Sequence, residues 1–243
     1  MIDTAFILAA GRGKRLKPVT NFIPKPLVQA AGKTLIQRHL EACEASGFSR
    51  VIVNHAYRGE QLIEHCKGLH QKKEFSFDLH FSAEPEGGLE TAGGIVKALE
   101  LLDKQNFALI NADIYCELPL EHLRNIALGE HRLGHLILCP TPAYKENDDF
   151  FLKPDAKHPE NNASLCHSSV AAQRTGYTFT GLSVLNPQLF EGHPQGKHPL
   201  APLLRSAMDQ EKISAEIFSG EWHDVGTPER LKALRKMLNL RAN

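Results

Sequence analysis

The chain has 243 residues, of which 42% are hydrophobic, and its formal net charge is +0. That length can bury a sizeable core in one large domain or two small ones. The balanced charge argues against sequence-independent nucleic-acid binding, which depends on neutralising many phosphates. No apolar run approaches the roughly 18 residues of a membrane span, and Asp3 stands where a signal peptide requires positive charge. We therefore expect neither nucleic acid nor a membrane as a partner. A cytoplasmic location fits the scattered cysteines described below, and a monomer is the simplest expectation.

Short apolar runs alternate with helical patterns over the first 140 residues. The apolar runs predict strands at Ala5–Ala9, Arg50–Asn54, Asp78–Ser82, Ala108–Ala112 and Gly134–Cys139. The patterns between them predict helices at Thr34–Ser46, Arg58–Cys66, Thr91–Leu102 and Leu120–Leu128. This alternation is typical of an α/β fold with a Rossmann-like, mostly parallel sheet flanked by helices, which binds ligands at the carboxyl ends of its strands.

The pattern changes after residue 142. The polar stretch 147–173 predicts an insertion with some strand content, and the sequence YTFTGLSVL at 177–185 predicts a further strand. Helical patterns return at Leu200–Gln210 and Thr227–Leu240, the second with a threonine N-cap followed by proline. No linker or repeat separates two units, so we expect one domain over 1–243, with halves at 1–140 and 141–243.

Neither the cysteines nor the histidines indicate a zinc site. His131 and His135 are four residues apart, but no carboxylate or cysteine completes a ligand set, so we expect ordinary surface histidines. The cysteines are odd in number and lack CxxC spacing, which favours buried reduced thiols over disulfides. The five cysteines are Cys43, Cys66, Cys116, Cys139 and Cys166.

Positive charge is concentrated near the amino terminus, where residues 1–40 contain seven Lys or Arg and one acidic residue. The first predicted strand leads into Ala10-Gly11-Arg12-Gly13, where missing Cβ atoms let backbone N–H groups approach an anion. This arrangement favours a polyphosphate ligand, with a tight turn that happens to be basic as the alternative. Lys25 supports the ligand interpretation, because prolines on both sides fix the backbone around one cation.

Two common phosphate-binding motifs do not fit this region. The spacing is not GxGxxG, because the third residue after Gly13 is Leu16. The sequence AGKTL at 31–35 is similar to the end of a Walker A loop, but Leu27 occupies the position of its first glycine. The dehydrogenase and P-loop interpretations are therefore weak.

The sequence LAAGRGKRLKPVT at 8–20, followed by PKPL at 24–27, resembles the signature of sugar-1-phosphate nucleotidyltransferases. The resemblance extends over most of the chain. It continues through EPEGGLETAGGI at 84–95, LINADI at 109–114, TFTGLSVLNPQLF at 178–190, PLAPLLRSAMDQ at 199–210 and EWHDVGTPERL at 221–231. The last two blocks and the short chain are most similar to the N-acetylmuramate-α-1-phosphate uridylyltransferases of bacterial cell-wall recycling.

The resemblance implies a reaction and a metal. In this family the phosphate of a sugar 1-phosphate attacks the α-phosphorus of a nucleoside triphosphate, which yields a nucleotide-sugar and pyrophosphate. The resemblance implies UTP as the triphosphate and Mg²⁺ bridging phosphates and two aspartates, here Asp113 and Asp224. Carboxylate oxygens and Mg²⁺ suit a displacement that depends on positioning and charge neutralisation. Either aspartate by itself could instead cap a turn.

The resemblance also implies roles for individual residues. Gly11 and Gly13 would hold the triphosphate beside Ala10, and Arg15 would contact its β- and γ-phosphates. Lys25 would bridge the α-phosphate and the sugar phosphate. The half at 1–140 would bind the nucleotide, and the half at 141–243, including the C-terminal helix, would bind the sugar. Further contacts to the nucleotide are expected from Gly88 and Thr91, and contacts to the sugar substrate from Glu90, Gly93, Gly94 and Gly181.

Some features leave alternatives open. Ala112 replaces the family's usual glycine before the first metal aspartate, and the segment from Lys153 to Gly176, where the wall around the sugar would be built, departs most from the pattern. A mannose-1-phosphate guanylyltransferase or a glucose-1-phosphate thymidylyltransferase therefore stays possible, and a glycine-rich start of a helix could explain residues 90–94 without a ligand. A third alternative is a non-catalytic protein that binds a nucleotide-sugar as a sensor or subunit.

Overall fold

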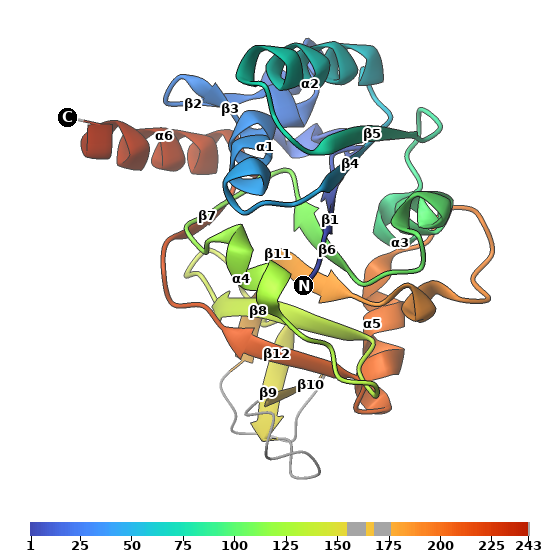
Figure 1. The fold of residues 1–243 in the computed structure, drawn as a ribbon. Coiled ribbons are helices and arrows are strands. Elements are labelled where there is room, and N and C mark those ends of the chain that lie inside the picture. The colour runs from blue at the N-terminus through green and yellow to red at the C-terminus, as the bar shows by residue number, and fades with distance from the viewer. Residues whose placement is uncertain (155–163, 168–175, 243) are drawn as a thin grey trace.

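A computed structural model describes residues 1–154, 164–167 and 176–242. Within this part of the chain, one nine-stranded sheet has the order β5-β4-β1-β6-β11-β8-β12-β10-β9 (Figure 1). Its strands are β1 (Thr4–Leu8), β4 (Arg50–His55), β5 (Asp78–Ala83), β6 (Phe107–Asn111), β8 (Gly134–Pro140), β9 (Phe150–Pro154), β10 (Ser164–His167), β11 (Gly176–Leu185) and β12 (Ile213–Ile217).

The sheet is parallel in its first half and mixed in its second. Strands β5, β4, β1 and β6 are mutually parallel. Strand β11 is antiparallel to β6 and β8, β12 is parallel to β8, and β10 is antiparallel to β9 and β12. The α/β class is confirmed, but continuous parallel pairing extends only from β5 to β6, and beyond β6 the β12–β8 pair alone is parallel among the described strands. No helix separates the strands among the described residues between 141 and 185, and strands without a crossover helix return antiparallel.

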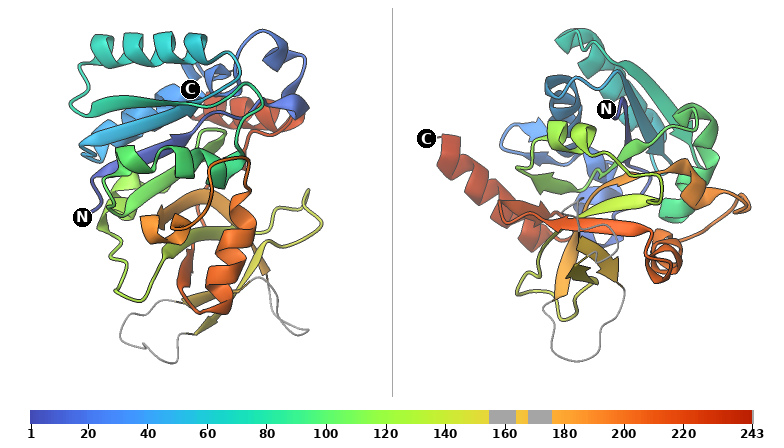
Figure 2. Two further views of the ribbon diagram at one scale, coloured as in Figure 1. Left: turned by 90° about the vertical axis from the view of Figure 1, so that its right-hand side faces the viewer. Right: turned by 60° about the horizontal axis from the view of Figure 1, so that its bottom comes forward.

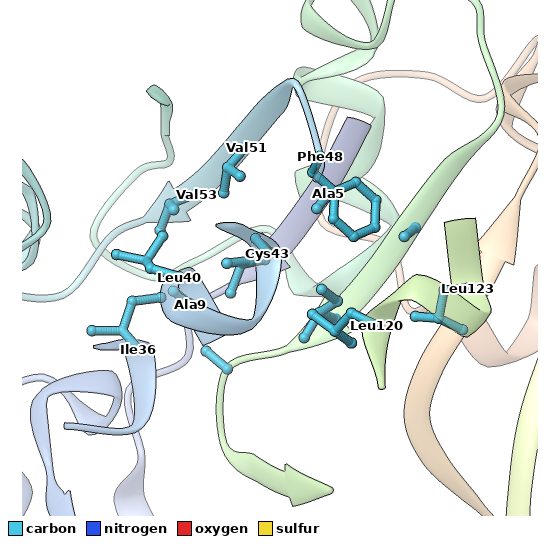
Figure 3. Packing of buried hydrophobic residues seen from close by; sticks show 14 of the residues in the cluster. Ala5, Ala9, Ile36, Leu40, Cys43, Phe48, Val51, Val53, Leu120 and Leu123 are labelled. Carbon is cyan, nitrogen blue, oxygen red and sulfur yellow. The ribbon is translucent and has the colours of Figure 1, made fainter. Parts of the chain in front are cut away.

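Helices cover both faces of this sheet, as the two rotated views show (Figure 2). Strand β1 explains why, because Ala5 and Ile7 belong to one buried cluster and Phe6 belongs to the other. The first cluster lies under α1 (Leu35–Ala45), α2 (Gly59–Lys73) and α4 (Leu120–Asn125), with Leu40, Phe48 and Val53 packed around β1 and β4 (Figure 3). The second cluster lies under α3 (Glu90–Lys97) and α5 (Leu200–Asp209).

The predicted helices and strands of the first 140 residues are confirmed, with differences at some helix ends. Helix α2 runs to Lys73 rather than ending at Cys66 as predicted, because Glu74 supplies the left-handed cap with φ 51°. The helix predicted over 91–102 divides into α3 and a 3-10 turn at Leu99–Leu102. Helix α4 ends at Asn125, three residues before the predicted end.

The second half contains the two predicted helices and several strands that were not predicted. Helix α6 (Pro228–Ala242) buries Leu231 and Leu234 against Leu16, Val28 and Leu35, and its distal end extends away from the body (Figure 1). Strand β12 was not predicted, and neither were two small sheets. In one, β13 (Trp222–Asp224) pairs with β7 (Ile114–Cys116), and in the other, β2 (Gln29–Ala30) pairs with β3 (Lys33–Thr34).

Strands β9 and β10 confirm strand content within 147–173. Residues 155–163 and 168–173 of that segment lie outside the described residues. Cys43, Cys66, Cys139 and Cys166 are buried free thiols, as predicted, whereas Cys116 is half-buried.

The prediction of a surface position for His135 was wrong. Its ring is buried, and Nδ1 lies 2.9 Å from Ser214 Oγ, because the residue faces inward on β8. Among the described residues, no helix combines the length and the apolar character that a membrane span requires.

Candidate active site

A three-lobed cleft lies beyond the carboxyl ends of β1, β4 and β6, and all three lobes share Asn111. The glycine lobe, of about 310 Å³, contains Ala10, Gly11 and Gly88. The carboxylate lobe, of about 620 Å³, contains Asp113 and Asp224. The apolar lobe, of about 470 Å³, is lined by Phe150, Phe179, Leu200, Leu204 and Arg205, among others.

The loop after β1 is shaped by its two glycines. A Cβ at Gly11 would meet nothing within 4 Å, so the backbone there faces open space in the glycine lobe. Gly13 has φ +63°, and a Cβ there would lie 3.0 Å from the side chains of Lys25 and Thr20. Thr20 Oγ1 donates to the Gly13 carbonyl at 2.9 Å. Gly13 therefore lets the loop pass close to Lys25, whereas Gly11 leaves room for a ligand.

The cations of this loop point to different lobes. Arg12 lines the glycine lobe, and its guanidinium carbon lies 5.1 Å from the centroid of the Tyr57 ring. Arg15 instead lines the carboxylate lobe. Arg12 is therefore the loop cation beside Ala10 and Gly11, and the contact of Arg15 with β- and γ-phosphates stays a prediction.

A hydrogen-bond network fixes the floor of the glycine lobe. The backbone N–H groups of Ala9 and Ala10 donate to Asn54 Oδ1 at 2.5 and 3.2 Å. Asn54 Nδ2 donates to Glu84 Oε1 at 2.6 Å, and the Leu89 N–H donates to Glu84 Oε2 at 2.7 Å. Burial raises the pKa of the Glu84 carboxyl, and these hydrogen bonds oppose the rise. The backbone N–H of Ala10 is thus already hydrogen-bonded to Asn54. Ala10 therefore contributes to the lobe by shaping its wall rather than by offering a free donor.

The segment from Gly88 to Gly94 divides between the cleft and the core. Gly88 (φ +69°) lines the glycine lobe, and Glu90 and Thr91 line the glycine and apolar lobes. A Cβ at Gly93 would collide with the Gly196 carbonyl, and one at Gly94 would collide with Glu84. Gly93 and Gly94 do not line the three lobes, and close packing explains why they are glycines.

Lys25 lines none of the three lobes, but it forms an ion pair with Asp113, which lines both the glycine and the carboxylate lobes. Lys25 is 8% exposed, in a 3-10 turn between prolines, and its Nζ donates to Asp113 Oδ2. Asp113 follows β6, where the chain turns into β7. The Asp113 carboxylate offsets the cost of burying the ammonium group, because a buried charge is tolerated only when it is paired.

Asp224 reaches the same lobe from a distant part of the sequence. It is opposite Ile114 in the β13–β7 pair, and the Val225 N–H donates to the Asp113 carbonyl at 2.9 Å. Asp224 Oδ2 accepts a hydrogen bond from Arg230 at 2.5 Å. The small sheet therefore brings Asp224, on β13, beside Asp113, which immediately precedes β7 and lies 111 residues away in sequence.

Gly181 (φ +85°) lies where β11 bulges between Phe179 and Ser183. A Cβ there would lie 2.7 Å from Asn111 Nδ2. Gly181 therefore makes room for the Asn111 side chain. The predicted contact of Gly181 with the sugar substrate would then be indirect, through the position of Asn111.

The sequence interpretation missed several residues of the cleft. Asn54 and Asn111 are polar residues at the carboxyl ends of buried strands, a position that could have singled them out. Tyr144 and Arg205 carry no comparable local signal, because they reach the cleft only through the packing of the second half.

The α/β sheet, the glycine-rich loop and the cleft with its lysine and two aspartates are the features of a sugar nucleotidyltransferase. Comparison with known proteins agrees: the nucleotidyl transferase family profile matches residues 4–150. The chain is 39% identical over 232 residues to the N-acetylmuramate alpha-1-phosphate uridylyltransferase of Neisseria meningitidis serogroup B, covering 94% of this chain and 95% of that protein. The chain belongs to the sugar-1-phosphate nucleotidyltransferases of this family.

Two further proteins are similar to the chain, one over only part of its own length and the other mainly in its fold. The chain is 27% identical to the mannose-1-phosphate guanyltransferase of Schizosaccharomyces pombe, over 93% of this chain but only 61% of that protein. A solved UDP-glucose pyrophosphorylase complexed with UDP-glucose superposes with a TM-score of 0.78 over 99% of this chain and 100% of the solved chain, at 17% identity. At that identity the superposition shows the fold, which is the nucleotide-diphospho-sugar transferase type.

Proposed function

We propose that this nucleotidyltransferase transfers a uridylyl group from UTP to N-acetylmuramate 1-phosphate and releases pyrophosphate. The observation that carries the proposal is the Lys25–Asp113 pair, whose aspartate lines both a lobe with open glycine backbone and a lobe with a second aspartate. The uridylyl donor and the muramate acceptor are supported by the name of the Neisseria relative, which is similar over nearly its whole length.

The carboxylate lobe fits Mg²⁺. Its two aspartates are hard oxygen donors, one on β13 and the other in the turn directly before its partner strand β7. Among the described residues, no group of three or more His, Cys, Asp or Glu side chains could enclose a metal. Mg²⁺ commonly takes one or two carboxylates and completes its shell with substrate phosphates and water. We therefore propose that Asp113 and Asp224 hold Mg²⁺, which would neutralise charge that develops on the phosphates.

The chain's own residues would position the reactants. The open backbone at Gly11 and the Arg12 side chain would bind the triphosphate. Lys25 would hold the α-phosphate and the sugar phosphate close together while an oxygen of the sugar phosphate attacks the α-phosphorus. The bond from the α-phosphorus to the bridging oxygen of the β-phosphate then breaks, and that oxygen leaves on pyrophosphate. Such positioning and charge neutralisation account for most of the catalysis of phosphoryl-type transfers.

The apolar lobe supports an acidic sugar. N-acetylmuramate differs from N-acetylglucosamine by a lactyl ether that ends in a carboxylate. The lobe offers apolar contact from Leu200 and Leu204, and Arg205 is a cation in its lining. The two acidic residues of the lobe, Glu90 and Asp149, already pair with Lys197 and Lys145. No ion pair within the described part of the chain engages Arg205, so it can pair with a ligand carboxylate.

Pyrophosphate release with Mg²⁺ tests the proposal. UTP, GTP and dTTP would each be combined with the 1-phosphates of N-acetylmuramate, N-acetylglucosamine, mannose and glucose. Selective turnover of UTP with N-acetylmuramate 1-phosphate is the expected result. Selective turnover of another pair would contradict the specificity and favour the guanylyl or thymidylyl alternative. Tight nucleotide binding without pyrophosphate release from any pair would contradict the activity and favour a nucleotide-sugar sensor.

A cytoplasmic monomer is also proposed. Four buried free thiols fit a reducing compartment. Light scattering on the purified chain would test the oligomeric state, and a dimer mass would contradict the monomer.

A further inference from the structure

Three contacts hold Arg230 over Asp224. Its Nη1 donates to Asp224 Oδ2 at 2.5 Å, and its guanidinium carbon lies 4.7 Å from the centroid of the Tyr144 ring. Its backbone N–H donates to Thr227 Oγ1 at 3.4 Å at the start of α6. Arg230, Asp224 and Tyr144 all line the carboxylate lobe. The guanidinium is therefore positioned inside the cleft from two sides, by a carboxylate and by an aromatic ring.

Gly226 makes room for this arrangement. A Cβ at that position would lie 2.9 Å from Asp224 Oδ1 and 3.0 Å from Arg230 Nη2. Any larger residue would push the ion pair apart or shift the backbone between β13 and α6. The glycine of the sequence DVGTP is thus explained by the ion pair, since its backbone is not in the left-handed region.

The two aspartates of the lobe are each neutralised in the same way. Lys25 donates to Oδ2 of Asp113, and Arg230 donates to Oδ2 of Asp224. The side chains of Asp224 and Arg230 are 26% and 21% exposed, so neither is fully hydrated. Two neighbouring carboxylates without counter-charges would repel one another at this degree of burial. A divalent cation between them would compete with both basic side chains for carboxylate oxygen.

We propose that Arg230 is a displaceable counter-cation, which neutralises Asp224 in the free protein and pairs with the phosphate of the sugar 1-phosphate once a divalent cation binds. This inference rests on the proposed metal site. The sugar phosphate is the favoured partner because Arg230 shares its lobe with Thr178 and Thr180 of β11, in the second half of the chain. The glycine lobe has a cation of its own in Arg12.

Metal binding without turnover tests the first part. Mn²⁺ would be titrated into nucleotide-free protein and free Mn²⁺ measured by electron paramagnetic resonance. Arg230→Met removes the competing cation, so it should bind Mn²⁺ about fivefold more tightly than the wild type, the scale of one partly exposed ion pair. If Arg230 served only to hold Asp224 in place, its loss would weaken Mn²⁺ binding. Unchanged or weaker Mn²⁺ binding by a folded Arg230→Met variant would overturn the proposal.

The matched control is Arg235→Met on the same helix. Arg235 Nε donates to the Gln29 carbonyl at 2.9 Å, outside the cleft, so Mn²⁺ binding should not change. If Arg230→Met does not fold, Tyr144→Ala provides the second variant. Loss of the ring should loosen Arg230 and tighten Mn²⁺ binding by a smaller factor, and no change there would count against the proposal.

Steady-state kinetics test the second part. Arg230→Met should raise KM for the sugar 1-phosphate about tenfold, the scale of one lost charge-assisted contact, with KM for the triphosphate within about twofold of the wild type. Arg230→Lys should give an intermediate KM, because it keeps the charge but loses the planar stacking. A rise confined to KM for the triphosphate would contradict the assignment to the sugar phosphate. The Mn²⁺ titration needs no turnover, so the two proposals can fail separately. If no substrate pair reacts but Arg230→Met still binds Mn²⁺ more tightly, the proposed function fails and the first part of this inference stands.

Discussion

The glycine lobe and the carboxylate lobe share Asn111 and Asp113, but their polar groups are satisfied in different ways. In the glycine lobe, backbone amides, Asn54 and Glu84 form a closed hydrogen-bond network. In the carboxylate lobe, basic side chains pair with the aspartates. A closed network fixes shape before a ligand arrives, whereas ion pairs between side chains can be exchanged for ligand charges. The glycine lobe is therefore shaped by internal hydrogen bonds, whereas the carboxylate lobe is held by ion pairs that a charged ligand can replace.

This difference follows from the elements that build each lobe. The glycine lobe is built on parallel strands β1, β4 and β5, whose ends are close together and within reach of backbone hydrogen bonds. The carboxylate lobe depends on a three-residue pair, β7 with β13, and on α6. Long side chains from these elements span the lobe and supply its charges.

The largest effect is expected where the exchangeable charges are removed. Lys25→Ala and Asp224→Asn should each lower kcat about 10²-fold or more, because the first removes the cation proposed to hold the phosphates and the second removes a proposed metal ligand. Pyrophosphate release measures the loss. Lys33→Ala is the matched control, since Lys33 pairs with Glu41 at 2.6 Å outside the three lobes. Near-normal turnover in either cleft variant would contradict the assigned roles.

A smaller effect is expected when the preformed lobe loses its network. Asn54→Ala leaves the amides of Ala9 and Ala10 and one oxygen of Glu84 without this partner. The free energy of unfolding should fall by about 1–3 kcal/mol, and KM for the triphosphate should rise about tenfold. Urea unfolding and steady-state kinetics measure the two quantities. A change in kcat with an unaltered KM would mean that the network does not shape the triphosphate site.

The apolar lobe offers a test of sugar choice. Arg205→Gln should lower kcat/KM for N-acetylmuramate 1-phosphate about tenfold, the scale of one lost charge-assisted hydrogen bond, and leave the value for N-acetylglucosamine 1-phosphate nearly unchanged. The ratio of the two kcat/KM values is the readout. Equal losses for both sugars would show that Arg205 does not recognise the carboxylate.

The smallest effect is expected at a contact between a carboxylate and two histidines outside the cleft. Glu216 lies 3.7 Å from His135 Nε2 and also pairs with His122, and these contacts lower the pKa of its carboxyl from 4.5 to about 2. A depressed carboxyl pKa stabilises the fold above pH 4.5, and that contribution is lost as the pH falls towards 2. Glu216→Gln should therefore be less stable than the wild type near neutral pH, with a difference that shrinks in acid. Urea unfolding of both proteins at neutral and at acidic pH measures the difference in the free energy of unfolding. A difference that does not change with pH would contradict the link between the Glu216 pKa and stability.

Much of the fold could be predicted from the sequence, because apolar runs and helical periods decide the first four parallel strands and their helices. Lys25 and the loop at 10–13 could also be singled out from local sequence. The mixed second half could not, since β12 is half polar and β7 and β13 have only three residues each. Arg230 and Tyr144 meet only through long-range packing, and the internal use of Gly93, Gly94 and Gly181 depends on neighbours that are distant in sequence.

The most direct test is a crystal structure with Mg²⁺, a non-hydrolysable UTP analogue and the sugar 1-phosphate. The account predicts the triphosphate against Gly11, Mg²⁺ on Asp113 and Asp224, and both Lys25 and Arg230 moved from their aspartates to phosphate oxygens. An unchanged glycine-lobe network would accompany this exchange. A complex in which both ion pairs persist, with the metal bound elsewhere, would contradict the account.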